Sequence, residues 1–330
     1  MSESSNPNAA AGAPCVIAAF YQFAQLDDFS EMREALLKRC EGLGLLGSIL
    51  LAREGINGTV AGPGPAIDGL LEYLRADPRL AQLQDKRSQA SEAPFYRMKV
   101  RLKKEIVSLG VPGIDPLAEV GEYIEPEDWN ALVSGPGVRL IDTRNDYEYH
   151  LGSFEGAEDP GTRSFREFPE WVRQNLDPDR DEHVAMFCTG GIRCEKATAL
   201  LKQQGFKHVY HLRGGILNYL EKIDSEHSLW RGDCFVFDNR VTVDHQLGPG
   251  DFEVCPACRM PLTPEDRDSP LFEQHVSCPR CFDRLTPEKR EGLLERARQI
   301  ALAEGKGQRH LGSRAETPLT LSEDDTELES

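Results

Sequence analysis

The sequence predicts a protein of mixed α/β and α+β class with three structured regions. Strand-like and helix-like apolar segments alternate over the first two thirds of the chain, a Pro/Gly-containing linker near Gly113 divides them, and two cysteine pairs lie near the C-terminus. At 330 residues the chain is too long for one average domain. We expect an α+β N-terminal domain over 15–112, a central α/β domain over 122–226 and a small cysteine-rich region over 227–310.

The first region alternates elements in an order that defines a known topology. The patterns predict a turn at Gly55 and Asn57-Gly58, where glycine and asparagine punctuate the apolar runs. The order is strand, helix, strand, strand, helix, strand, over 15–23, 28–40, 46–52, 59–61, a segment opened by Pro65, and 95–106. This order is that of the ferredoxin-like split βαβ fold.

The second region repeats a strand followed by a helix. Strands are predicted at 138–141, 184–187 and 208–212, and helices at 164–176, at 194–204 and after Gly214-Gly215. Repeated units of this kind form a parallel sheet with functional loops at the carboxyl ends of its strands. The third region contains a predicted hairpin over 234–243, turning at Asp238-Asn239, and a charged helix over 287–303.

Composition limits the classes of protein to consider. The net charge of −17 argues against holding nucleic acid by bulk charge, and the acidic tail, 311–330, is expected to be disordered, as is the start, 1–14. We expect no membrane span, because no run of about 18 apolar residues occurs. The start has no signal-peptide pattern, so we expect a cytoplasmic protein with reduced cysteines. Nothing points to an obligate protein partner.

A thiol lies where the predicted strand 184–187 gives way to a helix. We expect Cys188 to face loop N–H groups and the positive end of that helix, which both favour a thiolate. Gly190 and Gly191 let the backbone turn inward, and Arg193 adds positive charge that can cradle an anion. We interpret Cys188 as a nucleophile; the alternative is a buried core cysteine.

The same loop resembles that of the rhodanese family. Members carry a nucleophilic cysteine in a six-residue loop that opens a helix, and 188–193 has this length. The family signature is matched by Asp142-Thr143-Arg144, Glu148, Gly152, Gly156-Ala157 and the glycine pair Gly214-Gly215. The resemblance implies a rhodanese-like catalytic domain over 122–226, with Asp142 and Arg144 as accessory residues.

Three segments together resemble the tRNA uridine-34 hydroxylase family over about residues 15–310. They are Arg53–Thr59, Cys188–Lys196 and the two cysteine pairs. This resemblance implies oxygen-dependent formation of 5-hydroxyuridine at the wobble position, with Cys188 essential, tRNA as partner and molecular oxygen as co-substrate. We expect no flavin or NAD site, because we interpret no segment of the sequence as a dinucleotide-binding Gly-x-Gly-x-x-Gly fingerprint.

A second cysteine follows in the predicted helix. Cys194 lies six residues after Cys188 and is an accessory candidate that could resolve an oxidised Cys188 as a disulfide. The alternative is a cysteine that merely packs in the helix.

The two cysteine pairs have the spacing of metal knuckles. Cys255 and Cys258 form one pair and Cys278 and Cys281 the other, which together supply four thiolates. A closed set of four thiolates is a structural zinc site. The alternatives are a relic site without metal, two disulfides, or an iron–sulfur cluster.

Basic residues mark candidate RNA contacts. The alternating set on the predicted strand 95–106 suits a phosphate backbone, and a plain solvated strand face is the alternative. The candidates are Arg53, Asn57, Lys99, Arg101 and Lys103, with Arg259 or Arg280 in the knuckles.

Two other functions remain open. The thiol loop supports thiosulfate or persulfide sulfur transfer through a Cys188 persulfide equally well, with Arg144 and Arg193 suited to an anionic donor. A non-catalytic RNA-binding module is a third class, although such a module needs no nucleophile.

Overall fold

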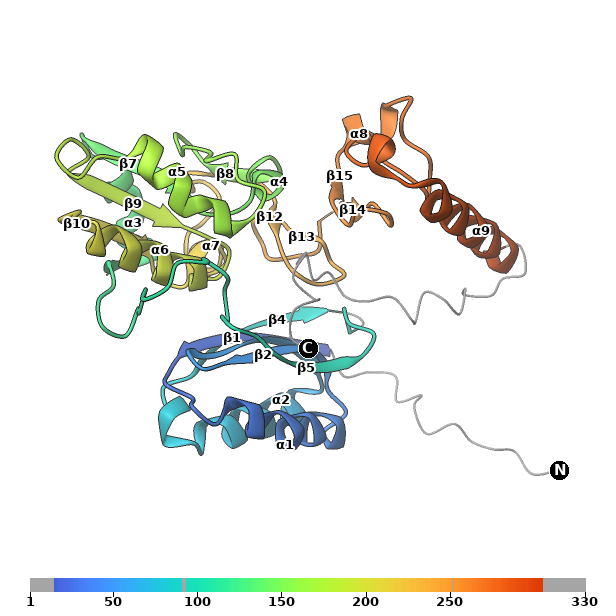
Figure 1. Cartoon of the computed structure of the whole chain (residues 1–330), viewed down its shortest axis with the longest axis horizontal. Helices are drawn as coiled ribbons and strands as arrows, with labels where there is room; N and C mark the ends of the chain where they lie inside the picture. The colour runs from blue at the N-terminus through green and yellow to red at the C-terminus, as the bar shows by residue number, and fades with distance from the viewer. Residues whose placement is uncertain (1–14, 91–92, 251, 305–330) are drawn as a thin grey trace. The chain divides into compact units, whose positions relative to one another are not determined.

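The computed structural model describes residues 15–90, 93–250 and 252–304, so the two predicted disordered ends, 1–14 and 311–330, lie outside the described residues. The chain divides into two compact units, with the division in the sequence between Ile106 and Val107 (Figure 1). Each unit is described separately below. Within the described ranges, no helix combines the length and the apolar character needed to cross a membrane.

The N-terminal unit is a five-stranded sheet with two helices. Its elements are β1 (Cys15–Phe23), α1 (Phe29–Gly42), β2 (Leu46–Ala52), β3 (Gly55–Gly62), α2 (Gly64–Arg75), the 3-10 turn η1 (Pro78–Leu80), β4 (Gln84–Ala90) and β5 (Met98–Leu102). The strand order is β4-β1-β3-β2-β5, in which β1–β4 pair antiparallel and β5 runs parallel to β2. The first four strands have the ferredoxin-like order, which confirms the predicted fold class.

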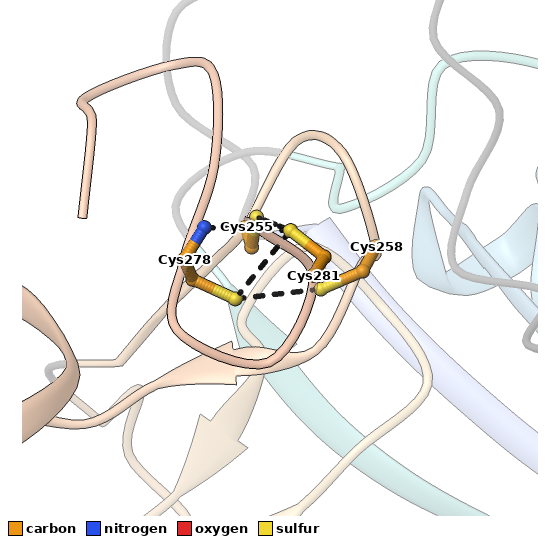
Figure 2. Close-up of side chains that lie close together, drawn as sticks. All are labelled: Cys255, Cys258, Cys278 and Cys281. Atoms are coloured by element: carbon orange, nitrogen blue, oxygen red, sulfur yellow. Dashed lines mark hydrogen bonds between the residues drawn. The ribbon is translucent and has the colours of Figure 1, made fainter. Parts of the chain in front are cut away.

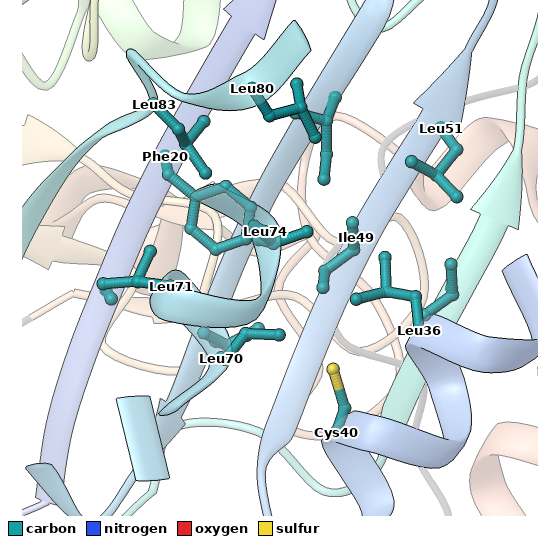
Figure 3. Packing of buried hydrophobic residues seen from close by; sticks show 14 of the residues in the cluster. Phe20, Leu36, Cys40, Ile49, Leu51, Leu70, Leu71, Leu74, Leu80 and Leu83 are labelled. Atoms are coloured by element: carbon teal, nitrogen blue, oxygen red, sulfur yellow. The ribbon is translucent and has the colours of Figure 1, made fainter. Parts of the chain in front are cut away.

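Both helices of this unit cover one face of the sheet (Figure 1). Figure 3 shows Leu36 of α1 and Leu70 and Leu74 of α2 packed over Phe20 and Ile49 of the sheet. All five side chains are buried, and burying each stabilises the fold by about 1.5–3 kcal/mol. The helices therefore fix one face of the sheet as core.

Two details of the predicted N-terminal topology are wrong. The fourth strand is β4, a polar edge strand without apolar alternation, and the predicted strand 95–106 is the shorter fifth strand β5. Asn57-Gly58 lies inside β3, and the turn is at Arg53-Glu54 instead. Gly58 is needed for packing, because a Cβ there would lie 2.8 Å from the Phe20 ring.

The second unit begins with a four-stranded parallel sheet in the order β6-β10-β9-β7. Its elements are β6 (Glu122–Ile124), α3 (Pro126–Val133), β7 (Val138–Asp142), α4 (Asp146–Tyr149), β8 (Gly152–Phe154), the 3-10 turn η2 (Phe165–Glu167), α5 (Phe168–Asn175), β9 (His183–Phe187), α6 (Ile192–Gln203), β10 (His208–Leu212) and α7 (Gly215–Lys222). The predicted helix over 164–176 is thus a 3-10 turn followed by α5, whose first turn accommodates Pro169.

The central strand β9 is buried on both faces. Val184 and Met186 pack in the core with α5 and α6, whereas Ala185 and Phe187 pack in the core with α3 and α7. This explains the continuous apolar run before Cys188, because a strand covered by helices on both sides needs no polar face. The predicted parallel α/β domain is confirmed.

The rest of this unit contains short strands and two helices. They are β11 (Trp230–Gly232), β12 (Cys234–Phe235), β13 (Thr242–Val243), β14 (Glu253–Val254), β15 (Pro261–Leu262), α8 (Pro264–Asp268), the 3-10 turn η3 (Phe282–Arg284) and α9 (Pro287–Glu304). The predicted hairpin exists as the antiparallel pair β12–β13, with shorter strands than the sequence suggests.

Candidate active site and metal centre

Cys188 lies at the carboxyl end of β9, in the loop before α6. Ile216 N–H of α7 donates to the Cys188 carbonyl at 3.0 Å, and Leu217 N–H donates to the Thr189 carbonyl at 3.1 Å. Gly215 makes this approach possible, because its φ is +69° and a Cβ would lie 2.4 Å from the Cys188 carbonyl oxygen. With the loop carbonyls held by α7, loop N–H groups turn toward the sulfur.

The Cys188 sulfur is buried but lies in a setting that favours negative charge. The Gly191 N–H donates to Cys188 Sγ at 3.1 Å. Burial alone raises the pKa of the Cys188 thiol and is the largest single effect. A hydrogen bond from Cys194, the charge of Arg193 and the N–H groups of both residues together outweigh it and lower the pKa to about 6. The loop therefore favours the thiolate form of Cys188.

Arg193 is held beside the thiol by a carboxylate. Its two terminal nitrogens donate to Glu148 at 2.6 and 2.8 Å, and both side chains are buried. Burial raises the pKa of Glu148, but the Arg193 charge and its hydrogen bonds more than offset this and keep the pKa below its usual range. Because Glu148 orients the guanidinium, Arg193 acts on the sulfur mainly by charge. Its role as an anion cradle stays a prediction.

The accessory pair is a buried ion pair. Arg144 Nε donates to Asp142 at 2.9 Å, and Arg144 also donates to the Gly152 carbonyl at 2.6 Å. The guanidinium lies 5.1 Å from the centre of the Trp230 ring, and neither Asp142 nor Arg144 is exposed. The pair ties the end of β7 to β8, so its contacts are structural.

Cys194 lies against the reactive thiol from the first turn of α6. Its thiol interacts with Cys188, and burial followed by the nearby thiolate raises the pKa of Cys194 well above its usual range. Thr143 Oγ1 lies 3.6 Å from Cys194 Sγ and donates to the Phe187 carbonyl at 3.0 Å. Cys194 thus remains protonated and can donate to the Cys188 thiolate.

The sequence assigned no contact to three residues that shape this site. Glu148 and Gly215 belong to the family signature, but their contacts with Arg193 and with the loop carbonyls depend on the sheet order. Thr143 had no signal beyond its place between Asp142 and Arg144.

The thiolate contacts predict a shift in reactivity with pH. Alkylation of Cys188 by iodoacetamide should increase with pH around a midpoint of about 6, since only the thiolate attacks. Cys194→Ala removes a donor to the charged form, so the midpoint should move up toward the ordinary value of 9.0. Cys194→Ser, which keeps a hydroxyl donor, should shift it less. Alkylation is mapped to Cys188 by peptide mass spectrometry.

The control is Cys40→Ala, which removes a buried thiol from α1. An unchanged midpoint in Cys194→Ala would contradict the donor role. Full tRNA modification by Cys194→Ser would exclude Cys194 as a resolving cysteine, because serine forms no disulfide.

The register of the N-terminal sheet places most of the predicted RNA-binding residues on one face. Val100 packs in the core beneath the helices, so its neighbours Lys99 and Arg101 point to the opposite face of β5. Asn57 and Arg101 both pair with Leu50, which puts them in one row. Lys103 follows the strand, and its N–H donates to the Leu51 carbonyl at 2.9 Å.

Arg53 and Asn57 make contacts within the N-terminal unit. Arg53 pairs with Asp27 at 2.7 Å on the surface. The Asn57 amide donates to the Ile106 carbonyl at 3.0 Å, which fixes the chain after β5.

One glycine pattern contradicts the expected absence of a dinucleotide fingerprint. The spacing Gly-x-Gly-x-x-Gly does occur, at 42–47. It follows α1 and leads into β2, whereas a pyrophosphate site needs a strand before the glycines and a helix after them. The pattern therefore supplies no helix N-terminus for a nucleotide.

The four paired cysteines converge on one point (Figure 2). The sulfur of Cys255 lies 3.8 Å from that of Cys281, and Cys278 Sγ lies 3.6 Å from Cys258 and 3.8 Å from Cys281. A tetrahedron of thiolates at about 2.3 Å from a zinc ion has sulfur–sulfur edges of about 3.8 Å. The four sulfur atoms thus fit a metal ion. Within the second pair, the Cys278 N–H donates to Cys281 Sγ at 3.4 Å, a contact typical of metal-binding knuckles.

Comparisons with known proteins agree with this architecture. A family described as UPF0176 acylphosphatase-like domain matches residues 15–106, and the rhodanese-like domain family matches residues 125–222. A tRNA uridine(34) hydroxylase of Agrobacterium fabrum is 53% identical over 90% of this chain and 95% of its own length. Hydroxylases of the same name from Teredinibacter turnerae and Brucella ovis are 54% and 56% identical, each over 91% of this chain and over 94% and 99% of their own lengths.

These identities extend over both units, so they cover the ferredoxin-like sheet, the thiol loop and the cysteine cluster together. The family predicted from the thiol loop and its flanking segments is confirmed, and the chain belongs to the tRNA uridine(34) hydroxylase family.

Proposed function

We propose that this protein hydroxylates uridine 34 of tRNA to 5-hydroxyuridine, with Cys188 as its reactive group and molecular oxygen as co-substrate. Family membership at more than half identity supports the reaction. The observation that carries the assignment of the residue is the contact of the Gly191 N–H with Cys188 Sγ at 3.1 Å, in a loop where Arg193 lies close by. These contacts lower the pKa of the thiol, as a nucleophile requires. Arg193 and the loop glycines Gly190 and Gly191 support it by charge and backbone geometry.

The proposed role of the thiolate is addition to the base. Cys188 Sγ forms a bond to C6 of uracil, and the C5=C6 electron pair moves to C5 as an enolate. The oxidant is a peroxide, formed from O₂ and two electrons that a donor outside the chain supplies. The C5 carbon attacks its terminal OH oxygen, and the O–O bond breaks with its electron pair on the other oxygen. C5 thereby gains an OH group. Loss of the C5 proton then expels the thiolate and restores the ring.

Nucleoside mass spectrometry of tRNA tests the reaction. Cells lacking this protein should lose 5-hydroxyuridine and its wobble derivatives, and the wild-type gene should restore them. Loss of a thiolated base instead would favour sulfur transfer through a Cys188 persulfide, and no change in either would leave a binding module.

The helix-free face of the N-terminal sheet is the proposed tRNA contact. Arg101 and Lys103 give it positive charge in a chain of net charge −17, and Lys99 lies on it with its ammonium nitrogen buried. Arg53 and Asn57 lie on the same sheet or at its rim. A basic face of this kind follows phosphates without reading the sequence.

Neutralising this face should weaken tRNA binding. The double change Arg101→Gln and Lys103→Gln should lower affinity for all tRNAs alike and reduce the salt slope of log Kd by about two, one for each lost phosphate contact. Filter binding over a salt series measures this. Lys38→Gln with Arg39→Gln, on the helix α1 across the sheet, is the matched control. Equal salt slopes for the two double variants would argue that the face is simply solvated.

We propose zinc as the ion of the four-cysteine cluster, because a closed set of four thiolates leaves no position for substrate. Bound there, zinc would hold the knuckles of the C-terminal region together. The ion would take no part in the chemistry at Cys188.

A further inference from the structure

One exposed aromatic side chain lies beside the active-site arginine. Phe237 is 40% exposed, and the Arg193 guanidinium lies 5.8 Å from the centre of its ring. Arg193 in turn exerts its charge on the Cys188 sulfur. Phe237 lies after residues 125–222, the segment that matches the rhodanese-like family. The domain of that family therefore does not include Phe237.

Most of the residues around Phe237 are buried, although Asn239 in the same turn is exposed. Phe235 is fully buried and packs edge-on against Tyr147, and Val236 and Val241 are also buried. The Phe237 ring meets that of Phe235 edge-on at 5.1 Å, and the residue stays 40% exposed. A single exposed apolar side chain is ordinary on a protein surface. What distinguishes Phe237 is its place beside Arg193, at the reactive thiol.

The turn is also held rigidly. Arg240 Nε donates to Asp238 at 2.9 Å, and both side chains are largely buried. Val236 N–H donates to the Val241 carbonyl at 2.9 Å. Val241 has a φ of +66°, which is rare for a β-branched residue, and such strain persists only where the surroundings impose it. The backbone that carries Phe237 is therefore held in place by the turn itself.

We propose that Phe237 stacks on the uracil base of nucleotide 34 and positions it for the Cys188 thiolate. This inference rests on the proposed function. A uracil is flat and uncharged, and an aromatic ring backed by a guanidinium is a usual platform for an unstacked RNA base. Phe237 would be a positioning residue that binds the base, with no part in the bond-making steps.

Two measurements test the stacking role. Phe237→Ala should lower kcat/KM for tRNA hydroxylation about 5- to 150-fold, the range expected for the loss of one base–aromatic stack. Phe237→Trp should restore most of it, because it offers another flat ring. In the wild type, an anticodon stem-loop with 5-iodouridine at position 34 should crosslink to Phe237 under ultraviolet light.

The control is Phe282→Ala. Phe282 is also exposed, and Arg290 lies 5.7 Å from its ring, but Arg290 pairs with Glu273 rather than with an active-site residue. Phe282→Ala should leave hydroxylation unchanged. Alkylation of Cys188 should keep its midpoint near pH 6 in Phe237→Ala, and a shifted midpoint would show instead that Phe237 acts through Arg193.

Failure of this inference differs from failure of the proposed function. If wild-type protein hydroxylates tRNA and Phe237→Ala does so equally well, the stacking role is overturned while the function stands. If wild-type protein hydroxylates no tRNA, the proposed function fails, and the crosslink still decides whether Phe237 meets the base. A crosslink that maps only to other residues overturns the stacking role in either case.

Discussion

A Cys188→Ser variant should leave cells as poor in 5-hydroxyuridine as cells that lack the protein. Serine keeps the shape of the side chain but replaces a thiol whose pKa is about 6 by a hydroxyl that stays protonated in the same loop. We expect hydroxylation in vitro to fall on the order of 1,000-fold or more, because the nucleophile itself is removed. Nucleoside mass spectrometry of tRNA from the complemented deletion strain measures the effect.

The matched control is Cys234→Ser, at another buried cysteine of the same unit. Burial raises the pKa of the Cys234 thiol to about 12, so this thiol is not a nucleophile at neutral pH. Cys234→Ser should therefore keep hydroxylation wherever the protein folds, which its melting curve reports. Normal 5-hydroxyuridine in Cys188→Ser cells would refute a nucleophilic role for Cys188.

A trapped intermediate separates the two chemistries open to this thiol. An anticodon stem-loop with 5-fluorouridine at position 34 should form a lasting adduct with Cys188, because fluorine replaces the hydrogen that must leave C5 as a proton before the C6–sulfur bond breaks. Mass spectrometry of the intact protein detects it. A persulfide that persists on Cys188 through turnover, with no nucleobase adduct, would favour sulfur transfer.

The position of this thiol between a strand and a helix could be predicted because the determinants of the loop are local. The apolar strand, the glycines and the start of α6 are consecutive in the chain, so their geometry follows from residues 184–194 alone. The Glu148 contact with Arg193 spans 45 residues and depends on how β7 and β9 pair. No periodicity in one segment reveals a partner on another.

The errors in the predicted fold have the same physical origin. Strand β4 is a polar edge strand, so apolar alternation, which reports burial, cannot detect it. Gly58 signals a turn in a single sequence, but in the fold it makes room for the Phe20 ring. Phe237 carries no signal either, because an isolated phenylalanine near a predicted hairpin is expected to be buried.

The cysteine cluster was predicted well because each knuckle is four residues long. Cys255 and Cys258, like Cys278 and Cys281, fix their own spacing, and only the meeting of the two pairs requires tertiary structure. Disrupting the contact between the two cysteine pairs is predicted to have the largest effect on stability.

Cys255→Ser should release the metal and unfold the C-terminal region. The buried cluster there consists of Cys255, Leu262, Cys278 and Cys281, so three of its four fully buried members are metal ligands themselves. Its strands β14 and β15 have two residues each. With so little apolar core, folding of this region depends on metal binding, which contributes about 10–16 kcal/mol at structural zinc sites. Elemental analysis should show one zinc per wild-type chain and none in the variant.

Hydrogen exchange reports where order is lost. Protection should fall across residues 252–304 in Cys255→Ser and persist in β9 and α6, whose cores contain no residue of the cluster. Cys15→Ser, at a half-buried thiol of β1, should retain both the zinc and the protection. Iron in place of zinc in the wild type would reassign the ion. Unchanged metal content and protection in Cys255→Ser would show that the sulfur atoms converge without holding a metal, since a four-thiolate site that loses one ligand cannot keep its affinity.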